Sequence, residues 1–146
     1  MGDWLNEYSH SNKLAGQAEM ETRADEVTRK NMKRILENYL VSRGWKPDIA
    51  WGMRHGIDIE AKRGKDRWII QVKGSTILPT LIVNGFLSVL GEVLQRMDDP
   101  NCKYSIALPD IGQFRRLWER LPALAKTRTG ITALFIKLDG DRVEEV

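Results

Sequence analysis

Hydrophobic positions along this chain change from a helical spacing to a strand spacing and back, and each change predicts an element boundary. Over residues 15–41 apolar side chains recur every three or four positions, which predicts a long amphipathic helix. Gly44 follows the last turn and is expected to end this helix. Residues 46–51 are predicted to form a first strand.

A hairpin is predicted over residues 57–73, where two alternating segments flank the charged turn at residues 63–66. Alternation places Asp58 on the polar face of the first strand. In the second strand it gives Gln71 and Lys73 a common face. Pairing of the two strands then brings an acid, an amide and an amine to one place on the sheet.

After the hairpin the pattern predicts a helix, a strand, a second helix and a last strand with a short tail. We expect Asp110 to cap the second of these helices, with Gln113 in the capping-box position, and Pro122 to end or kink it. The first helix is expected to start between residues 80 and 84 and to end near Met97, and the strands are expected at residues 103–108 and 131–138.

The predicted order of elements is helix, three strands, helix, strand, helix, strand. An antiparallel meander followed by strand-helix-strand crossovers gives an α/β fold, a mixed five-stranded sheet flanked by helices on both faces. The length of 146 residues suits one domain. We expect residues 1–14 to be a loose segment and residues 15–146 to form that domain.

Composition narrows the possible functions. The formal net charge of +3 permits nucleic-acid binding without requiring it, and 2 histidines with 1 cysteine are too few for a structural zinc site. A lone cysteine and the lack of a signal-peptide pattern suggest the cytoplasm. Residues 77–94 are apolar enough to raise the question of a membrane span, but Pro79, Gly85 and Glu92 favour a buried helix.

The constellation of Asp58, Gln71 and Lys73 resembles the PD-(D/E)xK nuclease superfamily, whose fold is shared by restriction endonucleases and has an αβββαβ core. Asp58 matches the metal-binding aspartate of that family, and Gln71 and Lys73 match its (D/E)xK pair. Ile57 stands where the family often has proline. Glutamine in place of the second acid is similar to the Mrr-type branch, in which QxK is usual.

The resemblance implies a magnesium- or manganese-dependent DNA endonuclease that hydrolyses phosphodiester bonds by a metal-activated water. In that reading Asp58 and Gln71 bind the metal ion, Gln71 through its side-chain oxygen. Lys73 stabilises charge on the attacked phosphate. Gln71 has one negative charge less than an acid, so a further carboxylate is expected to help.

This family often supplies a glutamate from its first helix. Glu21 lies on the helical stripe that continues the apolar face, and Glu26 lies beside it, so these two residues are our candidates. The alternative is that both are ordinary solvated helix acids.

Phosphate contacts are expected from Lys62, Arg63 and Lys65 around the hairpin turn, and from Ser75 and Thr76 after Lys73. A charged hairpin tip and loop capping are the alternative explanations. Arg115, Arg116 and Arg120 form a second basic group on a later helix.

Two other functions remain open from the sequence. One is a catalytically silent DNA-binding module on the same fold, and the other is an interaction domain that uses its apolar second helix. Residues 81–94 are apolar around almost the whole helical circumference, which predicts an exposed patch and a homodimer.

Overall fold

The computed structural model describes residues 4–52, 56–74 and 79–146, and the side chains of residues 23–52, 56–74 and 81–146. Its elements follow in chain order. They are α1 (Trp4–Ser42), β1 (Lys46–Ile49), β2 (Ile59–Arg63), β3 (Asp66–Val72), α2 (Pro79–Gln95), β4 (Lys103–Pro109), α3 (Gly112–Arg120), α4 (Ala123–Thr129), β5 (Thr132–Lys137) and β6 (Arg142–Glu145).

The strands form one mixed sheet in the order β1-β2-β3-β4-β5-β6. The β1–β2 and β2–β3 pairs are antiparallel, whereas β3, β4 and β5 run parallel. Parallel neighbours need crossover connections, and here α2 supplies the first and α3 with α4 the second. The α/β class, the mixed sheet with flanking helices and the αβββαβ order are therefore confirmed.

The sheet has six strands rather than the expected five, because the short tail pairs with β5. A tight turn makes this return possible. Gly140 and Asp141 both have positive φ values, of 97° and 50°, a conformation that glycine and aspartate tolerate better than most residues. Four residues then suffice for β6, which covers the edge that β5 would expose.

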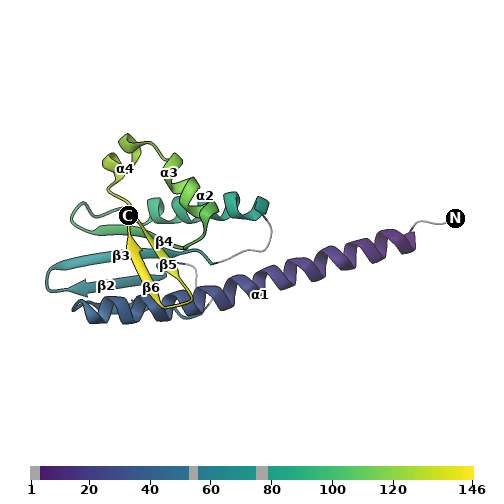
Figure 1. The fold of residues 1–146 in the computed structure, drawn as a ribbon, viewed down its shortest axis with the longest axis horizontal. Helices are drawn as coiled ribbons and strands as arrows, with labels where there is room; N and C mark the ends of the chain where they lie inside the picture. Colours follow the sequence, from purple (N-terminus) through teal and green to yellow (C-terminus); the bar gives the residue numbers. More distant parts are fainter. Residues whose placement is uncertain (1–3, 53–55, 75–78) are drawn as a thin grey trace.

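The first helix begins at Trp4, well before the expected start at residue 15, so it includes residues 4–14. Residues 4–15 contain neither glycine nor proline, and so nothing in them interrupts a helix. The C-terminal part of α1 lies along one face of the sheet, and its N-terminal part extends beyond the sheet (Figure 1).

Hydrophobic packing divides into two layers, one on each face of the sheet. Between α1 and the sheet, the core includes Met32, Leu36 and Ile70. Between the sheet and α2 and α3, it includes Phe86 and Phe114. Figure 1 shows this arrangement, with α1 on one side of the strands and α2, α3 and α4 on the other.

The start of α3 differs from the expected capping box. Its N-cap is Ile111, without a side-chain hydrogen bond, and the helix begins at Gly112. Asp110 instead forms a bidentate pair with Arg115, with N–O distances of 2.7 and 3.0 Å. The guanidinium of Arg115 donates two parallel charge-assisted hydrogen bonds to the carboxylate, which are stronger than one bond from a backbone N–H.

The apolar segment after the hairpin forms α2, and only one side of this helix is buried. In α2, Ile82, Phe86, Val89 and Val93 are buried against the sheet. Among the described residues, no helix combines the length and hydrophobicity needed to cross a bilayer.

Candidate functional site

Asp58 lies just before β2 and is almost completely buried, with 4% of the residue exposed. Oδ2 of its carboxylate accepts a hydrogen bond from the backbone N–H of Val72 at 2.9 Å. Oδ1 accepts one from Nη2 of Arg29 at 3.0 Å and lies 3.7 Å from Nζ of Lys33. Both carboxylate oxygens therefore have cationic or N–H partners within the protein.

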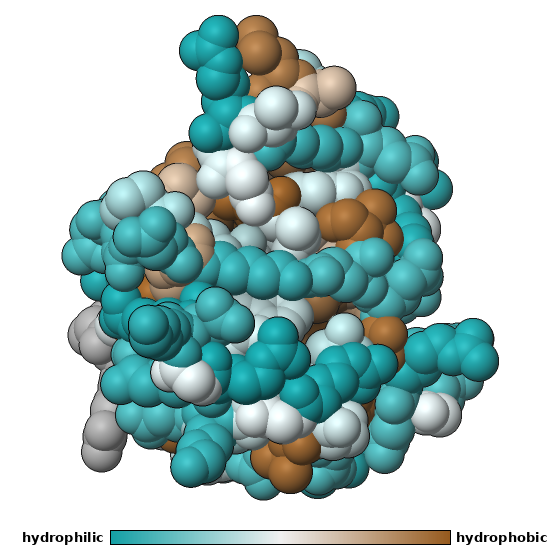
Figure 2. Space-filling view, turned by 90° about the vertical axis from the view of Figure 1, so that its left-hand side faces the viewer, coloured by the Kyte–Doolittle hydropathy of each residue, from teal (hydrophilic) through white to brown (hydrophobic). Residues whose placement is uncertain are grey.

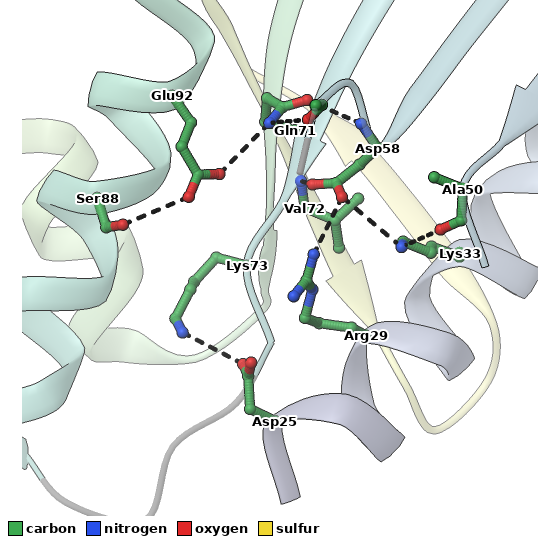
Figure 3. A network of polar contacts seen from close by, with 11 residues as sticks. Asp25, Arg29, Lys33, Ala50, Asp58, Gln71, Val72, Lys73, Ser88 and Glu92 are labelled. Carbon is green, nitrogen blue, oxygen red and sulfur yellow. Dashed lines mark hydrogen bonds and ion pairs between the residues drawn. The ribbon is translucent and has the colours of Figure 1, made fainter. Parts of the chain in front are cut away.

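Lys33 is the second buried charge of this group, with 3% of the residue exposed. Its ammonium donates to the backbone carbonyl of Ala50 and faces Asp58 (Figure 3). Burial lowers the pKa of Lys33, and the negative charge of Asp58 partly opposes that effect. The pairing explains how α1 can keep a lysine against the sheet.

The side-chain amide of Gln71 is fixed by partners on both of its ends. Its Oε1 accepts from the backbone N–H of Asp58 at 2.9 Å, which only an oxygen can do. Its Nε2 donates to the carbonyl of Gly56 and to the carboxylate of Glu92, both at 3.3 Å. Glu92 comes from α2, and Figure 3 shows it pointing toward the amide across the gap between helix and strand.

Lys73 follows β3 and turns away from Asp58 toward α1. Its ammonium lies 3.2 Å from Oδ1 of Asp25 (Figure 3). The side-chain stem passes Gly85 of α2 so closely that a Cβ there would lie 2.5 Å from Cε of Lys73. A Cβ on Gly74 would lie 2.6 Å from the backbone oxygen of Asp25, so two glycines permit this approach.

The structure brings Asp58, Gln71 and Lys73 to the same end of β3, as the hairpin predicted, but each has a separate partner. Glu26 is half-buried and lines a pocket beside Arg29. The side chain of Glu21 lies outside the described residues, as do Ser75 and Thr76.

The basic hairpin turn is exposed at Lys62, Arg63 and Lys65. Nζ of Lys62 lies 3.6 Å from the carboxylate of Glu60. The guanidinium of Arg63 lies over the ring of Trp45 and donates to the backbone of the α1–β1 connection.

Sequence reasoning missed the residues that contact Asp58 most directly, Arg29 and Lys33. A signal was present, because Asp25, Arg29 and Lys33 are spaced by four along α1 and therefore share one side of the helix. The buried Met32 and Leu36 lie next to this polar row, so its closeness to the sheet followed from the apolar stripe.

We tested whether these residues fit the divalent ion that the resemblance implies. Among the described residues, no group of three or more histidine, cysteine, aspartate or glutamate side chains is placed to hold a metal ion. The oxygens of Asp58 and Gln71 already accept hydrogen bonds from protein groups. Magnesium usually binds one or two carboxylates and keeps several waters, and here the Asp58 carboxylate faces two cations, which oppose a divalent ion.

No protein-family model matches the sequence, and no curated protein matches it. Several solved structures are similar in backbone, among them the two proteins named below. One is an XisH family protein from Nostoc punctiforme, with 15% identity over 78% of this chain and 96% of that chain, at a TM-score of 0.45.

The other is an FdxN element excision controlling factor protein from Anabaena variabilis, with 15% identity over 80% of this chain and 97% of that chain, at a TM-score of 0.46. A likeness this distant leaves the function to be argued from the residues themselves.

Proposed function

We propose that this chain is a nucleic-acid-binding module on a nuclease-like fold, in which Arg29 and Lys33 replace the metal ion. The observation that carries this proposal is that both oxygens of the Asp58 carboxylate face protein partners, Arg29 and Lys33 at Oδ1 and the Val72 N–H at Oδ2. A divalent ion at Asp58 has to displace both cations. Lys33 would then be left buried beside a second positive centre, which is costly at low effective dielectric.

Binding of the phosphate backbone is assigned to the exposed side chains of the β2–β3 turn, Lys62, Arg63 and Lys65. Figure 2 looks at the end of the molecule that is on the left of Figure 1, where this turn lies. The surface there is largely hydrophilic, with separate hydrophobic spots. Such a surface suits sequence-independent contacts with phosphates better than burial against a protein partner.

A magnesium-dependent DNA endonuclease is the second candidate, and one observation favours it. Asp58 and Gln71 meet beside the end of β3, and Glu92 adds a carboxylate 3.3 Å from the Gln71 amide. The DNA-binding proposal requires none of this convergence. This second candidate requires Arg29 to move away from Asp58, so that the carboxylate can bind a metal ion.

The experiment that separates the candidates measures DNA binding and DNA cleavage on the same preparation, with and without magnesium or manganese. We expect salt-dependent binding of a DNA duplex with no divalent-dependent cleavage. The doubly substituted Lys62→Gln, Lys65→Gln variant should reduce the slope of log K against log salt by about 2, at roughly 0.9 for each lost phosphate contact. Arg128→Gln, an exposed charge change on α4, serves as the matched control.

Cleavage of DNA that requires a divalent ion and is abolished by Asp58→Asn would establish the second candidate and refute the first. Absence of salt-dependent binding would refute both.

We also propose that two copies of the chain associate through α2. Leu81, Val83, Leu87 and Leu94 of this helix are exposed, by 38–57% of their surface. Several large apolar side chains exposed on one helix are characteristic of an association surface.

A further inference from the structure

A pocket opens beside the Asp58 network, between α1 and the chain that follows β1. Its volume is about 140 Å³, which is room for four to five water molecules at about 30 Å³ each. Its lining consists of Glu26, Arg29, Lys30, Lys33, Trp51 and Gly52. A space of this size suits a phosphate group and excludes a duplex.

Three cationic side chains and the carboxylate of Glu26 line this pocket, and Asp58 pairs with two of the cations, so these five groups leave one positive charge. Arg29 uses Nη2 for Asp58, while its Nε is buried and donates to no acceptor in the described part of the chain. A buried N–H without an acceptor is unfavourable. That Nε is inaccessible to solvent, but the Arg29 side chain is 27% exposed, so a phosphate oxygen in the pocket would contact the exposed part of the guanidinium and would lie near the exposed ammonium of Lys30.

Trp51 gives the pocket an aromatic wall that reaches solvent. It is 45% exposed, whereas Trp45, Trp68 and Trp118 are buried in the cores. An indole left exposed next to a cluster of cations is the combination on which single-stranded nucleic acids bind, since the cations hold phosphates and the ring stacks with a base.

We infer that this pocket binds the phosphate of one unpaired nucleotide of a nucleic-acid strand on Arg29 and Lys30, and that the base of this nucleotide stacks on the exposed ring of Trp51. The inference rests on the proposed nucleic-acid binding and adds the structural feature that is recognised. Contacts at the β2–β3 turn hold the duplex. The pocket gives a preference for DNA with an unpaired end or gap over fully paired DNA.

The test compares three DNA probes by fluorescence anisotropy at low salt. The first is a blunt duplex, the second carries one unpaired nucleotide at an end, and the third carries the same overhang without its base. We expect the second probe to bind on the order of tenfold more tightly than the first, and the third to lose that gain, because stacking of one base is removed.

The preference for the overhang should disappear in Trp51→Ala and persist largely in Trp51→Phe, with duplex binding unchanged in both. Lys30→Gln should weaken binding of both overhang probes, and Arg128→Gln should not. Trp51 and Lys30 are exposed, so these variants are expected to fold.

The outcomes distinguish this inference from the function on which it rests. Equal binding of all three probes would overturn the pocket assignment and leave the DNA-binding proposal standing. If no probe binds, the DNA-binding proposal fails, and titration with adenosine monophosphate decides the pocket alone. Quenching of Trp51 fluorescence by the nucleotide would then assign the pocket to free nucleotides and overturn the strand assignment, and absence of quenching would overturn both.

Discussion

At the scale of single residues, Gln71 is the most constrained side chain of the site, because its two ends bind groups of opposite character. Its oxygen accepts from the Asp58 N–H, and its nitrogen donates toward the Glu92 carboxylate. A glutamate offers only acceptors, so it satisfies the first contact and repels the second.

We therefore expect Gln71→Glu to lower the free energy of unfolding by about 1–3 kcal/mol at neutral pH, the cost of an unsatisfied buried polar contact. Adding Glu92→Gln in the same chain should restore most of the loss, because the new amide can donate to the new carboxylate. Urea unfolding of the wild type, both single variants and the double variant measures the coupling. A Gln71→Glu chain as stable as the wild type without divalent ions would contradict the arrangement.

Gly74 is the residue on which the close approach of α1 to the end of β3 depends. A Cβ at this position would lie 2.5 Å from Oδ1 and 2.6 Å from the backbone oxygen of Asp25. The backbone contact cannot be relieved by rotating a side chain, so Gly74→Ala must separate α1 from the strand end.

We expect Gly74→Ala to destabilise the protein by about 1–3 kcal/mol, as overpacking of a close contact does. Gly91→Ala is the control, since a Cβ at Gly91 meets nothing within 4 Å and the position is inside α2. That control should be neutral or stabilising by up to about 1 kcal/mol. Chemical denaturation of both variants shows the contrast, which would be absent if the glycine were needed only for chain flexibility.

At this scale the sequence allowed the meeting of Asp58 and Gln71 to be predicted, because strand alternation and a short turn leave little freedom in how a hairpin pairs. It did not reveal their partners. Whether Asp58 faces Arg29, Lys33 or a glutamate depends on the rotation and height of α1 over the sheet, which apolar periodicity defines only within a broad stripe.

At the scale of elements, Asp110 joins the end of β4, the start of α3 and β6. Its partner Arg115 also contacts Glu144 of β6 at 2.7 Å and lies over the ring of Phe135. The hydrogen bonds from Arg115 hold the pKa of Asp110 below its ordinary value of 3.8. A lowered pKa in the folded state means that the unfolded chain binds the proton more readily.

This pair therefore stabilises the fold above about pH 3.8, and its contribution is lost as the pH falls through the lowered pKa of Asp110. We expect Asp110→Asn to reduce the free energy of unfolding by about 0.5–1 kcal/mol at pH 7, a value typical of partly exposed pairs. The difference from the wild type should vanish in acid. Thermal unfolding from pH 2 to pH 7 follows it, and a difference independent of pH would exclude the ion pair as its source.

The same region shows why some elements could not be predicted. Asp110 followed by Gln113 satisfies the capping-box pattern, but that pattern does not include Arg115, whose guanidinium is a stronger partner for the carboxylate than a backbone N–H. Similarly, β6 is only 4 residues long, and it is a strand because β5 offers it an edge and not because of its own composition.

At the scale of the whole molecule, the fold class and the order of elements were predictable. They depend on many residues, so a wrong assignment at one position has little effect on them. The extent of α1 was not, because its first turns lack the apolar repeat by which a helix is recognised. The two-sided helical cover follows from parallel strands, which require crossovers.

Association of two copies is the prediction that belongs to this scale. Light scattering at micromolar concentration should give twice the monomer mass of 16.8 kDa. Leu87→Gln, which changes an α2 residue that is 57% exposed, should lower the measured mass toward that of the monomer. Leu124→Gln is the matched control, since this leucine is 64% exposed on α4. A constant mass of 16.8 kDa for the wild type would refute the dimer.

The polar row on α1 also bears on how this helix finds its place along the sheet. Apolar contacts alone tolerate a shift of α1 by one turn, about 5.4 Å, because leucine, isoleucine and methionine are similar in volume. A shift in one direction brings Glu37 to the place of Lys33, and a shift in the other brings Asp25 to the place of Arg29. Either shift puts a second carboxylate against the buried Asp58.

Repulsion between carboxylates therefore disfavours a shift of α1 in either direction. The ion pairs around Asp58 define one position of α1 along the sheet, which apolar contacts alone do not define. Replacing Glu37 with lysine removes one of the two repulsions, so we expect a fraction of molecules in which α1 is shifted by one turn. A second set of amide resonances from α1 in the NMR spectrum would show this fraction. Arg29 and Lys33 thus fix the position of α1 along the sheet, and this role does not depend on nucleic-acid binding.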